Sequence, residues 1–166
     1  DGMVLEMTVA ENIALQTYYK EPNSKNGILN YNVINAKARE LMKEFDVRGA
    51  GELIAGGELS GGNQQKAVIA REIDRDPELL IVSQPTRGLD VGAIEYIRKR
   101  IIAERDKGKA VIVVSFELDE ILDMSDRIAV IYDGAIQGIL DPAETIKLDL
   151  GILMAGGQLN KEEAKD

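Results

Sequence analysis

The chain has 166 residues, of which 45% are hydrophobic and 30% charged, a balance typical of a globular protein with a sizeable core. It contains neither Cys nor His, which excludes disulfides, thiol nucleophiles, Cys/His metal sites and histidine-based catalytic triads. With 29 acidic and 20 basic residues, the formal net charge is −9, which disfavours binding to a nucleic-acid backbone.

The N-terminal residues Asp1-Gly2-Met3 have neither the basic nor the apolar region of a secretion signal, and position 1 is not Met. We therefore expect the chain to be a piece of a longer protein. No segment reaches the roughly 18 consecutive apolar residues that a membrane span requires.

Two helices are predicted in the first 45 residues. Residues 8–11 have the Thr-x-x-Glu pattern of a capping box, which predicts a helix to about Tyr18. The apolar residues 4–7 before it predict a short strand. The second helix is expected at residues 35–45, and its apolar stripe consists of Ala36, Leu41, Met42 and Phe45.

Two loops and a third helix complete this N-terminal part. Residues 20–31 are rich in Pro, Asn, Ser and Gly, and residues 49–57 hold four glycines, so both are predicted to be loops. Ser60 precedes a helix that continues to about Arg75, where Asp76-Pro77 ends it.

Strands and helices alternate between residues 78 and 141. Residues 79–82 and 110–114 are continuous apolar runs typical of buried parallel strands, and a helix capped by Asp90 is expected between them. The elements predicted next are a helix at 118–124, a strand at 127–132, an Asp133-Gly134 turn and a return strand at 136–140. This order predicts an α/β fold, with a parallel sheet covered on both faces and a terminal β-hairpin.

The first candidate binding site is the start of the third helix. Ser60 stands at the cap position, and the glycines after it let a partner group approach the backbone. Free N–H groups at a helix start, with the positive end of the dipole, bind anions. The pattern also fits an ordinary serine-capped helix, and Ser-Gly-Gly alone does not decide between the two. The candidate residues are Ser60, Gly61, Gly62, Asn63 and Gln64.

The second candidate site follows the strand at residues 79–82. Ser83 and Gln84 place polar side chains at its carboxyl end, where open α/β sheets bind ligands. Asp90 lies shortly after, and its ordinary role would be to cap the next helix.

Together these stretches resemble the ATP-binding-cassette (ABC) ATPases. Residues 59–63 resemble the signature motif of that family, residues 79–84 its Walker B strand, and Leu89-Asp90 its D-loop. Residues 113–117 fall where the family has its switch histidine. The Asn-Gln-Gln-Lys run after Gly62 is most similar to import ATPases for ribose, galactose and nucleosides, above all to the second cassette of fused two-cassette proteins.

The resemblance implies three regions. Residues 1–75 would be the helical subdomain that carries the signature, and residues 76–157 the C-terminal half of the ATPase core. Residues 158–166 would be a polar tail. The phosphate-binding G-x-x-x-x-G-K-[ST] loop of the family is not in the sequence.

The chain departs from the family pattern at three positions. Ser83 replaces the aspartate that supports Mg²⁺, Gln84 the glutamate that polarises water, and Phe116 the switch histidine. A neutral Ser is a weak partner for a cation, and Gln cannot accept a proton as a carboxylate does. The resemblance therefore implies a degenerate hydrolytic site and a chain that is inactive alone.

The signature itself is intact. Cassettes of this family pair head to tail, so residues 60–64 and Asp90 are expected to contact the γ-phosphate of ATP held by a partner cassette. ATP and Mg²⁺ would then require the missing N-terminal part or that partner, and no metal ligand is expected in this chain.

The resemblance also implies partners and a location. The partners would be a second cassette, transmembrane permease subunits that contact the loops at 20–31 and 49–57, and indirectly an extracytoplasmic solute-binding protein. The protein would lie peripherally on the cytoplasmic face of the cell membrane, without nucleic acid. Strands that lack neighbours are also expected to make copies of the chain self-associate.

Two alternatives remain. Cassettes of DNA repair or translation usually have basic surfaces or long coiled coils, and this chain has neither. A regulatory or interaction module of the ABC type, without ATPase activity, is consistent with Ser83, Gln84 and Phe116, but the intact signature argues against it.

Overall fold

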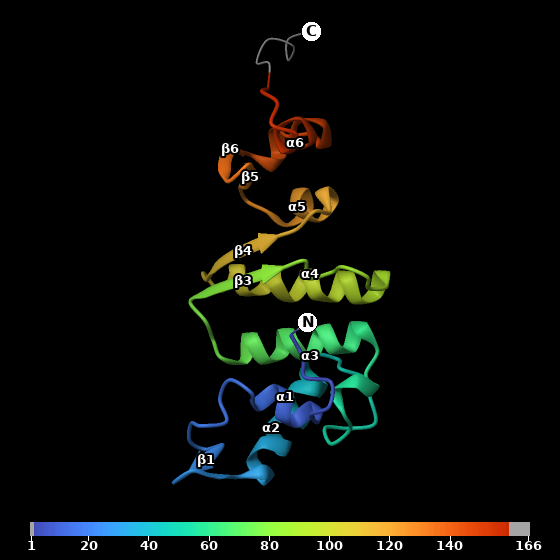
Figure 1. Cartoon of the computed structure of the whole chain (residues 1–166), viewed down its shortest axis with the longest axis vertical. Coiled ribbons are helices and arrows are strands. Elements are labelled where there is room, and N and C mark those ends of the chain that lie inside the picture. Colours follow the sequence, from blue (N-terminus) through green and yellow to red (C-terminus); the bar gives the residue numbers. More distant parts are fainter. Residues whose placement is uncertain (1, 160–166) are drawn as a thin grey trace. The chain divides into compact units, whose positions relative to one another are not determined.

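Two compact units divide the chain, Asp1–Ile112 and Val113–Asp166 (Figure 1). The computed structural model describes residues 2–159. The sequence predicted a different division of the chain, into a helical subdomain at residues 1–75 and half of an ATPase core at residues 76–157. That division stays a prediction. Of the predicted polar tail, residues 160–166 lie outside the described part of the chain.

The capping box that begins helix α1 (Val9–Ala14) is confirmed. The Thr8 hydroxyl accepts from the Glu11 N–H at 3.1 Å, and the Glu11 carboxylate accepts from the Thr8 N–H at 2.8 Å. The helix ends four residues before Tyr18. Residues 4–7 form turns rather than the predicted strand, because the buried Asn12 side chain takes both the N–H and the carbonyl of Val4, at 2.7 and 2.8 Å.

The predicted loop at residues 20–31 contains a small hairpin of β1 (Ser24–Lys25) and β2 (Ile28–Leu29). Asn26 and Gly27 connect the strands with φ values of 53° and 79°. Two consecutive left-handed residues are what a tight hairpin turn requires, and the Asn-Gly pair was the sequence signal for it.

Helix α2 (Tyr31–Glu44) begins four residues earlier than predicted, because the Asn30 side chain caps it. Its buried stripe runs through Ile34, Ala38, Leu41, Met42 and continues to Phe45. Ala36, predicted to lie in this stripe, is exposed, since it is two residues away from Ile34 and Ala38 and so faces away from them.

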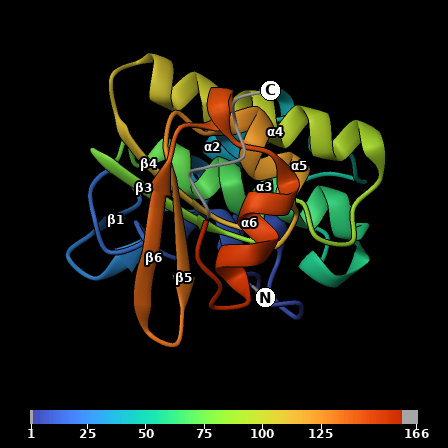
Figure 2. The ribbon, with the colours of Figure 1, turned by 90° about the horizontal axis from the view of Figure 1, so that it is seen from above.

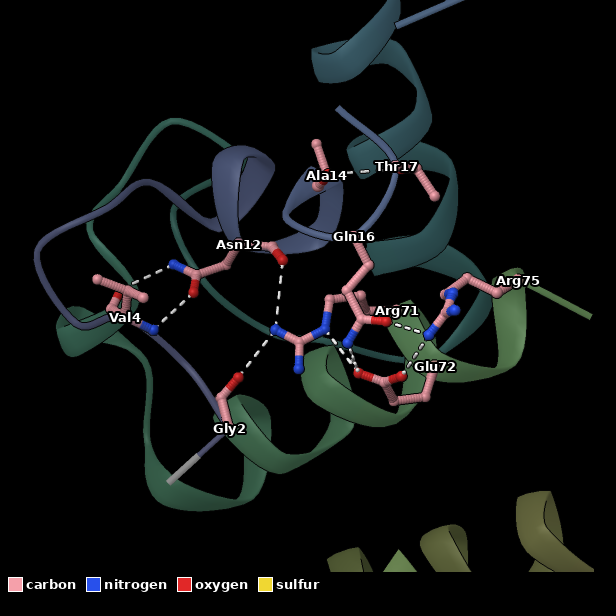
Figure 3. A network of polar contacts seen from close by, with 9 residues as sticks. All are labelled: Gly2, Val4, Asn12, Ala14, Gln16, Thr17, Arg71, Glu72 and Arg75. Carbon is pink, nitrogen blue, oxygen red and sulfur yellow. Dashed lines mark hydrogen bonds and ion pairs between the residues drawn. The ribbon is translucent and has the colours of Figure 1, made fainter. Parts of the chain in front are cut away.

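Helix α3 (Gly61–Asp74) packs against α1 and α2, and the core of the first unit lies where the three helices meet. Polar contacts tie its C-terminal half to the start of the chain (Figure 3). The buried Arg71 donates to the carbonyls of Gly2 at 2.8 Å and Asn12 at 3.4 Å. Its neighbour Glu72 accepts from Gln16 at 2.8 Å.

The glycine-rich segment before α3 pairs its backbone with the start of α1. The N–H groups of Val9 and Ala10 donate to the carbonyls of Ile54 and Glu52 at 3.0 and 2.9 Å. Thr8 and Ala55 form an antiparallel bridge, and the short 3₁₀ helix η1 (Gly56–Glu58) follows. The segment that leads into α3 is therefore fixed by backbone hydrogen bonds.

Helix α4 (Val91–Asp106) connects the paired strands β3 (Leu79–Ser83) and β4 (Ala110–Val114), which run in the same direction (Figure 1). The prediction of strands buried on both faces is wrong for the described residues. Leu80 is 5% exposed, but its neighbours Leu79 and Ile81 are 48% and 61% exposed. Among residues 2–159 each of these strands has a single partner, so one edge of each is unpaired, and the alternating exposure along β3 shows that one face of the pair is open.

The second unit holds the predicted hairpin (Figure 2). Its elements are α5 (Leu118–Met124), β5 (Ile128–Tyr132), β6 (Ala135–Leu140), the 3₁₀ helix η2 (Pro142–Glu144) and α6 (Lys147–Met154). The sequence did not predict α6, which lies beside the hairpin and buries Leu150 and Leu153 against Ile128 and Val130. None of the described helices is long and apolar enough to cross a membrane.

We expect Gly156→Ala to destabilise the second unit. Gly156 has φ 78°, and a Cβ there would lie 2.5 Å from Cε1 of Tyr132. Gly134 has φ 74° with open space around it, so Gly134→Ala adds the same backbone strain without the overlap. Gly156→Ala should therefore cost about 1–3 kcal/mol more in urea unfolding than Gly134→Ala. Equal losses for the two variants would contradict this packing.

Candidate functional site

The first turn of α3 has an unusual cap. Ser60 has the extended backbone of an N-cap residue, but its side chain caps no N–H of the helix. Instead Nδ2 of Asn63 donates to the Ser60 hydroxyl at 2.9 Å, and Oδ1 of Asn63 accepts from the Arg48 N–H at 2.8 Å. Ser60 and Gly61 are exposed. The turn therefore presents a serine hydroxyl and backbone N–H groups to the outside.

The two glycines of this turn have different surroundings. A Cβ at Gly62 would lie 3.3 Å from Cβ of Ala93 and 3.7 Å from Oδ2 of Asp90, so close packing against the start of α4 explains this glycine. A Cβ at Gly61 would meet nothing within 4 Å, and its φ is not in the left-handed range. Nothing among the described residues requires glycine at position 61.

Gln64, also predicted as a site residue, points back into the preceding segment. Its Nε2 donates to the carbonyls of Leu59 at 3.0 Å and Gly56 at 3.2 Å. The side chain therefore holds the entry to α3 in place, while the residues before it form the outer surface.

Asp90 lies next to this turn, although the sequence grouped it with the second candidate site. Its carboxylate caps α4 by accepting from the Ala93 N–H at 2.9 Å, the ordinary role that its position suggested. A single shallow pocket brings it together with the start of α3 and the end of α2. The residues lining this pocket include Ser60, Gly62, Asn63, Asp90, Asp46, Arg48, Lys66 and Tyr96.

Four of these pocket residues were not predicted from the sequence, and they form its charged side. Lys66 is 8% exposed and donates to the Asp46 carboxylate at 2.9 Å and to the Asp46 carbonyl at 3.0 Å. Its ammonium group also lies 4.8 Å from the ring centre of Tyr96. Arg48 donates to the same carboxylate at 3.1 Å. Asp46 has a left-handed backbone with φ 49°, and the only hint of this in the sequence was an Asp, which tolerates that conformation, directly after a predicted helix end.

The hydrogen bonds from Lys66 and then Arg48 lower the pKa of Asp46 below its ordinary 3.8. The bond to Asp46 raises the pKa of the Arg48 guanidinium. Burial is the main cause that raises the pKa of Tyr96 above 10.0. At neutral pH the Asp46 carboxylate and the Arg48 guanidinium are therefore both charged.

Ser83 and Gln84 lie in a second pocket, whose lining shares no residue with the first. Gln84 has φ 49° and stands in the turn where β3 ends. Gln65 and Glu72 of α3 and Arg87 also line this pocket. Within residues 2–159, no group of three or more acidic side chains is placed to hold a metal ion.

Phe116 belongs to the other compact unit and is 73% exposed. It follows β4 and directly precedes Glu117, the N-cap residue of α5. The three positions where the sequence departs from the family pattern therefore lie in both units of the chain.

Comparison with known proteins decides the family. The nucleoside import ATP-binding protein NupA of Lactococcus lactis subsp. cremoris (strain MG1363) is 74% identical over 161 residues, which are 97% of this chain and 32% of that protein. The dimeric structure of the cassette MJ0796, in a post-hydrolysis state bound to ADP and Pi, matches with a TM-score of 0.69 and 25% identity, over 84% of this chain and 59% of that one. This chain belongs to the ATP-binding-cassette family.

Two further relatives that this chain resembles are also import ATP-binding proteins. The guanosine import ATP-binding protein NupO of Bacillus subtilis (strain 168) is 55% identical over 99% of this chain and 32% of its own length. The ribose import ATP-binding protein RbsA of Bacillus cereus is 40% identical over 95% and 32%. This ABC chain thus spans about one third of the length of its curated relatives. No protein-family model matches it.

Asp46→Asn tests the charged side of the pocket. Because the pKa of Asp46 is lowered below 3.8, its ionised form stabilises the folded chain above that pH, and this contribution is lost as the pH falls through the lowered pKa. We expect Asp46→Asn to lower the Tm at pH 7, and the difference from the wild type to shrink as the pH falls through the lowered pKa of Asp46. Asp133→Asn is the control, since Asp133 has nearly the same backbone, with φ 48°. A pH-independent difference for Asp46→Asn would contradict the assignment.

Proposed function

We propose that this chain is the signature-bearing, C-terminal part of a cassette in an importer for nucleosides or simple sugars, and that it completes the ATP site of a partner cassette. The proposal depends on Gly61. This glycine is exposed, and a Cβ there would touch nothing in the described chain. Its missing side chain therefore gives room to a group outside the chain. The dimeric cassette bound to ADP and Pi, to which this chain is similar, supports a nucleotide and a second cassette as that group.

The first turn of α3 fits a triphosphate. The exposed Ser60 hydroxyl can donate a hydrogen bond, and the N–H groups of Gly61 and Gly62 add to the positive end of the dipole of a 14-residue helix. Donors fixed in this way stabilise the negative charge that grows on a phosphoryl group during transfer. ATP itself would supply that group. Asp90 caps α4 beside the same turn and would keep the two helix starts together.

The hydrolytic site of this cassette itself would be degenerate. Ser83, Gln84 and Phe116 offer no carboxylate or imidazole where the family has aspartate, glutamate and histidine. The side chains around Ser83 and Gln84 do not fit Mg²⁺, because the acidic residue lining this pocket, Glu72, is engaged by Gln16 and Arg71. We therefore assign no Mg²⁺-dependent step to these residues, and the role of the chain is to act on a nucleotide held elsewhere.

The partners in this proposal are a second cassette, permease subunits of the membrane and, through them, a solute-binding protein. The chain would lie on the cytoplasmic face of the membrane. Of the two loops expected to contact the permease, residues 49–57 already pair with the start of α1. Residues 20–31 are the more accessible, with Ile28 76% exposed.

A regulatory ABC-type module without ATPase activity is the second candidate function. The neutral side chains of Ser83 and Gln84 favour it, since they are what a cassette that no longer hydrolyses ATP would contain. Copurification with a permease separates the two functions, because a regulatory module of this kind would not bring membrane subunits with it.

Gly61→Arg should abolish most of the solute-stimulated ATPase activity. The test uses a full-length import protein that carries this segment, assembled with its membrane subunits. An arginine at the first position of α3 would fill the space of the nucleotide without a clash in this chain. Its control is Gly151→Arg, which puts the same side chain at an exposed glycine of α6, where a Cβ would also meet nothing within 4 Å. We expect at least about a hundredfold loss for Gly61→Arg, as for the loss of an oxyanion donor, and none for Gly151→Arg. Full activity of Gly61→Arg would exclude the proposed role.

The isolated chain should not bind Mg-ATP in a calorimetric titration, and activity should appear only when the remainder of the cassette pair is added. Tight binding by the chain alone would mean that it holds a complete nucleotide site.

Light scattering on the same sample should show self-association at micromolar concentration, because Leu79, Ile81, Ile112 and Val114 expose about half or more of their surface. A monomer at all concentrations would contradict association through the strands.

A further inference from the structure

We infer that Asn63 is a positioning residue, which fixes the direction of the Ser60 hydroxyl so that its proton points out of the chain. This inference rests on the proposed function of Ser60 as a donor to a nucleotide. It adds a residue whose action goes through Ser60 and not through the ligand. The Asn63 carboxamide makes two hydrogen bonds, and the partners of both are held in place by neighbouring residues.

The orientation of the carboxamide follows from its first partner. The backbone N–H of Arg48 can only donate, so the atom of Asn63 that lies 2.8 Å from it is the carbonyl Oδ1. The other end of the amide, which lies 2.9 Å from the Ser60 hydroxyl, is then Nδ2. Because Nδ2 can only donate, the hydroxyl oxygen accepts there, and the Ser60 proton cannot point toward Asn63.

The hydroxyl is also not used as an ordinary helix cap. A serine at this position normally accepts from the N–H of the second or third helical residue, and Ser60 does not. The third helical residue is Asn63, whose side chain has taken the place of its N–H. The arrangement therefore leaves the N–H groups of the first turn without a cap from Ser60, and it leaves the serine proton to be donated away from Asn63 to an acceptor outside the chain.

The partner of Oδ1 is itself held in place. Arg48 lies two residues after Asp46, whose carbonyl and carboxylate both accept from the ammonium group of Lys66. Lys66 is 8% exposed and lies one turn after Asn63 on α3. The turn at residues 46–48 is thus joined to α3 both through Asn63 and through Lys66, so the Arg48 N–H that donates to Oδ1 of Asn63 is held in place.

Asn63→Asp tests the inference, because it keeps the shape of the side chain and reverses one hydrogen bond. One carboxylate oxygen still accepts from Arg48, but the other replaces the Nδ2 donor and draws the Ser60 proton inward. In the full-length import ATPase with its membrane subunits, we expect kcat to fall at least about tenfold with little change in the KM for ATP. Asn63→Ala, which frees the hydroxyl to rotate, should lose less, about two- to fivefold.

Measuring both Asn63 variants in a Ser60→Ala background separates a positioning role of Asn63 from a structural role and from a direct effect of charge on the nucleotide. If Asn63 acts through Ser60, Asn63→Asp and Asn63→Ala have no further effect on kcat once Ser60 is alanine. A merely structural role predicts the opposite order, with the alanine variant worse because it loses both bonds. A direct charge effect on the nucleotide predicts that the loss from Asn63→Asp persists in the Ser60→Ala background. Either of these results would overturn the inference.

The proposed function and this inference fail in different ways. If Ser60→Ala alone leaves kcat unchanged, the proposed function fails. If Ser60→Ala lowers kcat and Asn63→Asp does not, the function stands and the positioning role of Asn63 is wrong. The Tm of each variant is measured in the full-length protein, and we expect Asn63→Asp to keep the wild-type value within about 2 °C, because a carboxylate at a helix start is favourable.

Discussion

The position of helix α3 depends on buried cations that find oxygen partners at both of its ends. Arg71, 8% exposed, reaches the carbonyls of Gly2 and Asn12 and the carboxylate of Glu72, while Lys66, equally buried, reaches Asp46. A buried charge that loses its partner destabilises a protein by several kcal/mol, so these contacts allow α3 little freedom to rotate or slide. The rest of the first unit is arranged around this helix.

This anchoring explains how the first turn of α3 can remain exposed. The packing of the helix is satisfied by its C-terminal half and by Lys66, so Ser60 and Gly61 take no part in holding it. Gly62 contributes by letting the start of α4 come close. The outer surface of the turn is therefore available for binding, although the backbone beneath it is fixed.

Local signals in the sequence predicted the helix starts well. The Thr8–Glu11 capping box and the Asp90 cap are made by residues three positions apart, so their partners can be found without knowing the fold. The strand predicted at residues 4–7 was wrong because the buried amide of Asn12, on a neighbouring helix, takes the backbone groups of Val4. Burial of both faces of the strands was also predicted wrongly for the described residues, because a continuous apolar run does not reveal which face is covered, and Leu79 and Ile81 are exposed.

The candidate site shows the same difference between features that local sequence signals predict and features that depend on the fold. Residue types and spacing predicted Ser60, Gly61, Gly62, Asn63 and Asp90, and all of these except Gly61 line one pocket. The contact between Asn63 and Arg48 joins residues 15 positions apart, and that between Lys66 and Asp46 spans 20. No local pattern indicates pairs of this kind, because their geometry depends on how α2 and α3 pack.

The open space around Gly61 has a consequence for how variants of this protein are interpreted. A residue whose side chain would touch nothing in its own chain can change without altering folding, solubility or cellular abundance. Screens that score variants by the amount of protein would therefore rate substitutions at position 61 as harmless.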